Sequence, residues 1–173
     1  MRKGHEIRLY NLIFPLWLIL WWPSLLWLLI IPLNYGLDFL VTYLCTKDLP
    51  EHGKFCRKYV WKICLAGFLA DLAGVAIMLI ITVGGGAAGA DKIGWLDDIT
   101  GAVMMNPFTH PVSLIIVLLI IALCAFLIFV LDRKILMKTG LTAEKARYVA
   151  LRLAIFTAPY VFLFPSSLLY TEL

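Results

Sequence analysis

Long runs of apolar residues, separated by short polar stretches, dominate the pattern along this chain. Three of these runs are predicted to be helices that each cross a membrane once, at about 59–83, 111–131 and 148–170. Each run has at least the roughly 20 residues that a bilayer core about 30 Å thick requires. The pattern therefore predicts an all-α integral membrane protein.

Polar residues at the edges of the runs predict where the helices begin and end. The stretch Asp48–Glu51 has the spacing of a capping box, which places a long helix over 49–83 with its first turns in the cytosol. The triplet Gly84–Gly86 is expected to stop that helix. An outer loop is then expected over 84–110.

Similar signals delimit the last two helices. His110 followed by Pro111 predicts the start of a helix over 111–139, with His110 as its cap, and Gly140 is expected to end it. Thr142 can cap a further helix over 142–170, which carries Glu144 in its first turn. These two helices would form an antiparallel hairpin with a very short loop.

The first apolar region, 9–44, is too long for one crossing and short for two. Pro15, Pro23 and Pro32 interrupt it, and the sharpest break is expected around Pro23. Lys and Arg concentrate on cytoplasmic loops. A Pro-broken membrane hairpin places fourteen of the fifteen Lys and Arg residues inside, with only Lys92 outside, whereas a single crossing also leaves those of the N-terminal tail outside.

The charge count thus favours three transmembrane helices plus an N-terminal re-entrant hairpin over 9–44. The N-terminus would be cytoplasmic and the C-terminus outside. The alternative is four transmembrane helices, of which the first is long and kinked and has its N-terminus outside.

Composition supports a membrane location and excludes several classes of protein. Hydrophobic residues make up 62% of the chain and charged residues 15%, against roughly 45–50% and about 25% in soluble domains. The mean hydropathy is +0.93. The plasma membrane is the expected location. Nucleic-acid binding is not expected, because the net charge of +4 comes from residues that set topology and no recognition fold is present.

Asp71 lies in the middle of an apolar helix and is the strongest functional candidate. Intramembrane carboxyl groups are costly, face the protein interior and mark proton or ion pathways. Asn34 and Asp38 are the other intramembrane polar residues, and Asn34 is expected at the same depth as Asp71. Asp71 could bind a proton or cation during transport, or it could hydrogen-bond a neighbouring helix and lock the bundle. The sequence favours the second role.

Small residues near Asp71 predict a close helix contact. They recur at helical spacing, and small residues let membrane helices approach closely. The contact could lie within the chain or between copies, so a homo-oligomer or a membrane-protein partner is expected. The predicted packing face consists of Ala66, Gly67, Ala70 and Gly74.

A basic stripe precedes the same apolar run. Three of its lysines are four residues apart and share one helical face, which suits contact with anionic lipid headgroups. The plainer interpretation is a topology signal. The stripe consists of Lys54, Arg57, Lys58 and Lys62.

No pattern of catalytic residues, metal ligands or cofactor-binding residues is present, so an enzyme, a metal and a cofactor are not expected. The leading interpretation is a small non-enzymatic membrane protein that self-associates or serves as a subunit of a membrane assembly. The alternative is a small channel or a proton- or cation-coupled transporter that uses the intramembrane Asp71.

Overall fold

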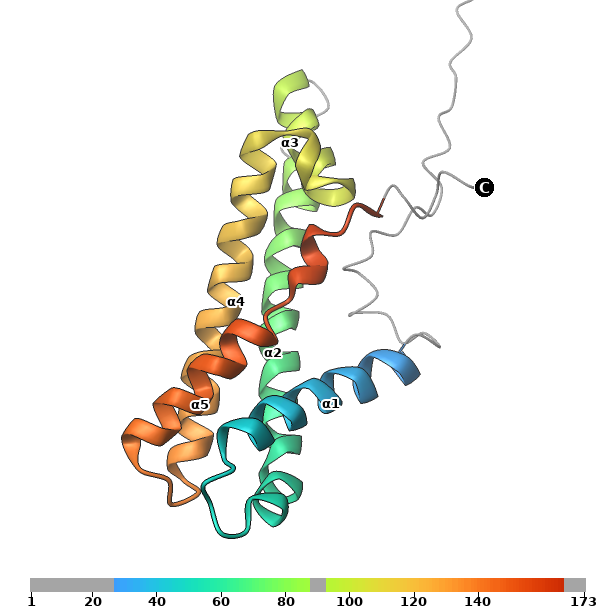
Figure 1. The fold of residues 1–173 in the computed structure, drawn as a ribbon. Coiled ribbons are helices and arrows are strands. Elements are labelled where there is room, and N and C mark those ends of the chain that lie inside the picture. The colour runs from blue at the N-terminus through green and yellow to red at the C-terminus, as the bar shows by residue number, and fades with distance from the viewer. Residues whose placement is uncertain (1–26, 88–92, 167–173) are drawn as a thin grey trace, which may run out of the picture.

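The computed structural model describes residues 27–87 and 93–166, and all regular structure in these ranges is helical (Figure 1). The main helices are α1 (Trp27–Cys45), α2 (His52–Ala87), α3 (Gly94–Met105), α4 (Pro111–Met137) and α5 (Ala143–Phe156). Two short 3-10 helices, η3 (Pro107–Thr109) and η4 (Tyr160–Leu163), complete the described chain.

Four of these segments are long and apolar enough to cross a membrane: 27–45, 52–87, 111–137 and 143–163. Large apolar side chains cover the outside of the bundle, as expected where lipid is the solvent. Leu28 is 75% exposed, Ile80 70% and Leu119 65%. The predicted class, an all-α membrane protein, is therefore confirmed.

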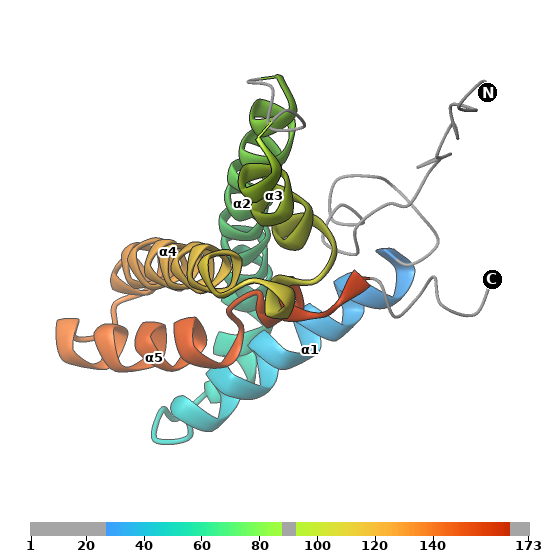
Figure 2. The same ribbon diagram turned by 90° about the horizontal axis from the view of Figure 1, so that it is seen from above.

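The long helices α2 and α4 run side by side, and α1 and α5 cross them obliquely on one side of that pair (Figure 2). Helix α1 contacts both α2 and α5, and α5 contacts α4. Two groups of buried side chains hold the helices together. One surrounds Val75, Cys124 and Phe162, and the other surrounds Ile63, Ile128 and Leu153.

The N-terminal region is described only from Trp27 onward. Helix α1 corresponds to the second arm of the predicted hairpin and carries Pro32 inside it. The first arm and the expected break at Pro23 lie outside the described residues. The choice between a hairpin and one long kinked helix therefore stays open.

Helix α2 differs from its prediction at both ends. It begins at His52 instead of residue 49, because the Asp48 carboxylate accepts a hydrogen bond from the Lys145 side chain at 2.6 Å and does not cap the helix. It also runs through Gly84–Gly86 to Ala87. Among the described glycines only Gly140 has a positive φ, so the glycine triplet keeps helical hydrogen bonding and does not form the left-handed cap that ends helices.

The outer loop predicted over 84–110 is largely helical. Helix α3 occupies 94–105 and packs on α2 and α4. Ile99 and Val103 are buried and lie four residues apart, so α3 has the apolar face of an amphipathic helix. The Ser113 hydroxyl donates to the carbonyl of Ile99 at 2.9 Å and ties α3 to α4.

The caps predicted for the last two helices are confirmed. The Nδ1 atom of His110 accepts from the backbone N–H of Val112 at 3.2 Å at the start of α4. Helix α4 ends at Met137, slightly before residue 139, and Gly140 follows it with a φ of +88°. The Thr142 hydroxyl accepts from the backbone N–H of Lys145 at 3.3 Å at the start of α5.

The helix predicted over 142–170 is shorter than expected. Helix α5 ends at Phe156 because Pro159 follows, and a proline disfavours helical backbone in the residue before it. The short helix η4 then continues in the same general direction and buries Phe162 against α2. The last membrane-spanning segment is thus one α-helix and one 3-10 turn joined at a proline.

Candidate functional site

Three buried aspartates, one from each of three helices, form a carboxyl cluster inside the bundle. Asp38 lies on α1, Asp71 on α2 and Asp132 on α4. Their exposed fractions are 5%, 7% and 1%. Carboxyl groups are seldom buried to this degree unless they are paired or functional, so the carboxyl cluster is the candidate functional site.

Asp38 is the central member of the cluster. Both Asp71 and Asp132 lie close enough to it to interact electrostatically. The Cys64 thiol and the Thr157 hydroxyl reach the Asp38 carboxyl as hydrogen-bond partners. The Thr157 hydroxyl has one proton for two acceptors, because it also lies 2.9 Å from the carbonyl oxygen of Leu153.

Three of the four oxygens of the other two carboxyl groups have no hydrogen-bond partner among the described residues. Within the described residues, neither side-chain oxygen of Asp132 has a partner, nor does the Oδ1 atom of Asp71. Two nearby basic residues of the α5 segment have other partners: Lys145 pairs with Asp48, and Arg152 lies over the ring of Tyr148. Three carboxylates that share a low-dielectric interior without a basic partner cannot all stay charged. Protons or another cation must balance them.

Each of the three carboxyls lies within about three turns of the end of its helix or of a basic residue on it. Asp132 is five residues before the end of α4, roughly 7 Å along the helix axis, and Asp38 is seven residues before the end of α1, roughly 10 Å. Asp71 is nine residues beyond Lys62 on α2, roughly 14 Å.

The geometry favours protons over a bound metal ion. Within residues 27–87 and 93–166, no three His, Cys, Asp or Glu side chains converge as metal ligands would. Asp71 and Asp132 each interact with Asp38 in the middle. Such an arrangement suits the binding of protons one carboxyl at a time better than the coordination of one ion by all three.

The structure brings together two of the three polar residues predicted from sequence. Asp38 and Asp71 interact directly. Asn34 is half-buried one turn before Asp38, on the same face of α1, but the hydrogen bonds of the described residues do not include its side-chain amide. Its proposed contact with Asp71 therefore stays a prediction.

The predicted packing face lies mainly against the protein's own α4 and η4. Ala66, Ala70 and Gly74 are buried, and the Cys124 thiol donates to the carbonyl of Ala70 at 3.3 Å. A Cβ atom at Gly74 would meet the Cys124 sulfur at 2.5 Å and the Phe162 ring at 2.7 Å. Gly67 is half-buried and has open space around it.

The predicted basic stripe lies on the exposed surface at the start of α2. Lys54 forms an ion pair with Glu51 at 2.8 Å. The ammonium groups of Lys58 and Lys62 lie over the neighbouring rings of Tyr59 and Trp61, at 5.3 and 5.4 Å from their centroids. These rings belong at a membrane interface, and Arg57 is exposed beside them. Contact with anionic headgroups stays a prediction.

Two features of the site were not predicted from the sequence: the burial of Asp132 and the contact of Cys64 with Asp38. Asp132 stands next to Arg133 and Lys134, which mark the cytoplasmic edge of the helix and make its neighbour look solvent-exposed. Helical spacing carries the signal, because Asp132 is four residues after the buried Ile128.

Comparison of the chain with protein-family models, curated proteins and solved structures found no match.

Proposed function

We propose that this protein moves protons across the membrane through the carboxyl cluster, coupled to the movement of a solute. The burial of three interacting carboxyl groups, none of which forms an ion pair with a described residue, is the observation that carries the proposal. Intramembrane carboxyls that face a bundle interior recur in the proton relays of pumps and transporters. A purely structural lock requires hydrogen bonds, and Asp132 forms none with the described residues.

The site supports proton binding more than association as the primary role. The predicted packing face is largely occupied by α4 and Phe162 of the same chain. Within that face, Gly67 has nothing within 4 Å of an added Cβ atom and leaves room for another helix. Self-association, or docking on another membrane protein, therefore stays a separate prediction about that surface.

Replacing Asp71 with Asn is expected to abolish proton flux, because an amide has the same shape but cannot take up and release the proton. The measurement uses the purified chain in liposomes with a pH-sensitive dye inside and an imposed pH gradient. Tetraphenylphosphonium, a lipophilic organic cation, is supplied on one side as the solute. Flux through the Asp71→Asn variant should fall to the level of protein-free liposomes.

The matched control is Asp48→Asn. Asp48 is outside the membrane-spanning segments, and the hydrogen bond from Lys145 holds the pKa of its carboxyl below the usual range. It therefore stays charged at neutral pH and takes no part in proton transfer. Flux should match that of the parent. Equal flux in the parent and the Asp71→Asn variant would overturn the proposed role of the cluster.

We further propose that the protein lies in the plasma membrane with its N-terminus and the loops at 46–51 and 138–142 in the cytosol. The Lys145–Asp48 ion pair joins the chain at these two loops, so they lie on the same side of the bundle. Eleven of the fifteen Lys and Arg residues lie near that end in sequence, as expected for the cytoplasmic side.

Thiol labelling tests this orientation. In a cysteine-free background in intact cells, Asp98→Cys should react with a membrane-impermeant reagent, because Asp98 is exposed on α3 at the opposite end. Gly4→Cys, Lys47→Cys and Lys138→Cys should react only after permeabilisation. Labelling at Gly4 alone would favour a single first crossing, and labelling at Lys47 and Lys138 would reverse the whole orientation.

A further inference from the structure

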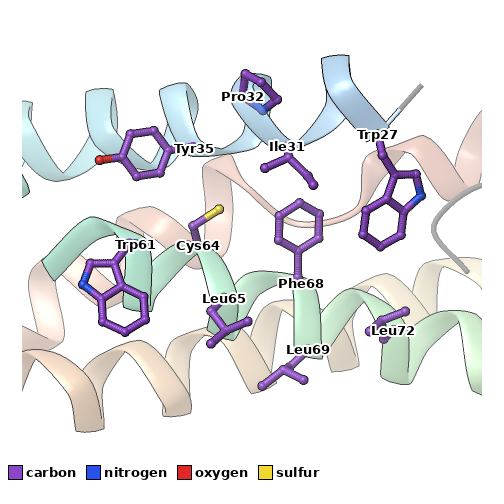
Figure 3. A pocket seen from close by; sticks show the side chains of 10 residues that line it. All are labelled: Trp27, Ile31, Pro32, Tyr35, Trp61, Cys64, Leu65, Phe68, Leu69 and Leu72. Atoms are coloured by element: carbon purple, nitrogen blue, oxygen red, sulfur yellow. The ribbon is translucent and has the colours of Figure 1, made fainter. Parts of the chain in front are cut away.

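An apolar groove lies between α1 and α2, next to the carboxyl cluster. The two helices contact each other along part of their length and leave a cavity of about 800 Å³ between them. Figure 3 shows the side chains of both helices that line it. Small-molecule sites typically have volumes of about 300–1,000 Å³, so a drug-sized molecule fits.

Aromatic rings form much of the lining of the groove. Trp27 and Tyr35 come from α1, and Trp61 and Phe68 from α2. The rings of Trp27 and Phe68 stack with 6.3 Å between their centroids and 7° between their planes. The faces of aromatic rings attract cations, most strongly when water is excluded.

Cys64 connects the groove with the carboxyl cluster. Its side chain lines the groove and points from α2 toward α1 (Figure 3). The same thiol is a hydrogen-bond partner of Asp38 and interacts electrostatically with Asp71 and Asp132. One side chain thus lies between the aromatic cavity and the Asp38 carboxyl, so a ligand in the cavity is within reach of the electrostatic field of the cluster.

Among residues 27–87 and 93–166, the groups that interact with the cluster are acidic or neutral. Helix α2 contributes Cys64, helix α4 contributes Cys124, whose thiol interacts with Asp71, and the end of the α5 segment contributes the hydroxyl of Thr157. An anion in the groove would be repelled. A neutral lipid chain would gain nothing from the cluster. A hydrophobic cation would gain from both the rings and the carboxyls.

We propose that the groove binds a lipophilic organic cation, such as an aromatic phosphonium or quaternary ammonium ion, and that its binding releases a proton from the carboxyl cluster. The charge balances, because one positive charge enters as one proton leaves to water. This inference rests on the proposed proton-binding function and assigns the solute class to which proton movement is coupled.

The test compares two ions of matched shape and opposite charge. Tetraphenylphosphonium and tetraphenylborate are titrated separately into the detergent-solubilised full chain, and binding is measured by equilibrium dialysis. The phosphonium ion should bind, and its binding should release protons from the protein. A pH indicator in weak buffer detects this release. The borate ion should bind no more than it partitions into detergent alone.

Two variants and a control locate the binding. Phe68→Ala should weaken phosphonium binding about tenfold or more, since a desolvated cation–π contact is worth about 2 kcal/mol and each 1.4 kcal/mol is tenfold. Asp38→Asn should abolish the proton release. Phe126→Ala removes a ring that is 60% exposed on α4 and does not line the groove, so it should bind like the parent.

Failure of this inference can be told from failure of the proposed function. Equal binding of both ions, or no effect of Phe68→Ala, would mean that the groove holds lipid chains and would overturn the inference. Proton flux with another solute, measured in the same preparation, would still support the proposed function. Phosphonium binding that releases no proton in the parent would overturn the proposed coupling between cation binding in the groove and proton release from the carboxyl cluster.

Discussion

Replacing Asp132 with Asn is expected to make the protein more stable while it abolishes proton movement. Asp132 is 1% exposed, and neither of its carboxyl oxygens has a hydrogen-bond partner among the described residues. A buried group of this kind costs about 1–3 kcal/mol, and more when it is charged. Asn keeps the shape and removes the possibility of a buried charge.

Asn remains a buried polar group, so only the part of this cost that comes from charge is removed, and the expected gain is at most about 1–3 kcal/mol in the free energy of unfolding. For a chain of 150–250 residues each 1 kcal/mol corresponds to about 2–4 °C in melting temperature. The measurement is a thermal melt of the purified protein in detergent. Asp48→Asn serves as the control and should melt close to the parent, because an exposed ion pair contributes little.

The sign of the shift separates the two roles considered for the intramembrane carboxyls. A carboxyl that locks the bundle by hydrogen bonds would lose them in part on substitution, and the melting temperature would fall. A carboxyl kept for proton transfer is retained at a cost to stability, so its removal raises the melting temperature. A lower melting temperature for Asp132→Asn would therefore restore the structural interpretation.

Adding a single methyl group at Gly74 is expected to destabilise the bundle strongly. The Cβ atom of Gly74→Ala would lie 2.5 Å from the Cys124 sulfur and 2.7 Å from the Phe162 ring. Both neighbours are almost completely buried, so neither can move aside easily. Overpacking of this kind costs about 1–3 kcal/mol, and Gly74→Leu should cost more and prevent isolation of a folded protein.

Gly67 on the same helix provides the matched control. A Cβ atom at Gly67 has nothing within 4 Å, and Ala is favoured over Gly inside a helix by about 0.5–1 kcal/mol. Gly67→Ala should thus raise the melting temperature in the assay in which Gly74→Ala lowers it. Similar shifts for both variants would mean that α2 does not contact Cys124 and Phe162 as described.

The helix caps could be predicted because their signals are local. His110, Thr142 and Gly140 act through backbone groups within three residues, and each has the predicted role. Asp48 failed as a cap because Lys145, far away in sequence, offers it a stronger partner. A local sequence pattern predicts the end of a helix correctly only when no charged residue distant in sequence binds the capping side chain instead.

The candidate site could be predicted only in part. Asp38 and Asp71 were recognisable because each stands alone in an apolar run. Helical spacing places Asp132 on the buried face of α4, but it does not tell which helices surround that face, and the same holds for the contact of Cys64 with Asp38. Phe162 was missed for a similar reason, since it lies in the 3-10 helix that follows Pro159 and is buried against α2.

Proton flux through the parent, compared with a variant in which Asp38, Asp71 and Asp132 are all Asn, tests the central claim most directly. Both proteins are placed in identical liposomes with a pH-sensitive dye inside and the phosphonium ion supplied on one side. The parent should move protons, and the triple variant, if it melts at or above the parent's temperature, should match empty liposomes. A triple variant that moves protons as fast as the parent would contradict a role for these carboxyls in proton transfer, whereas no flux in the parent would contradict the phosphonium ion as the coupled solute.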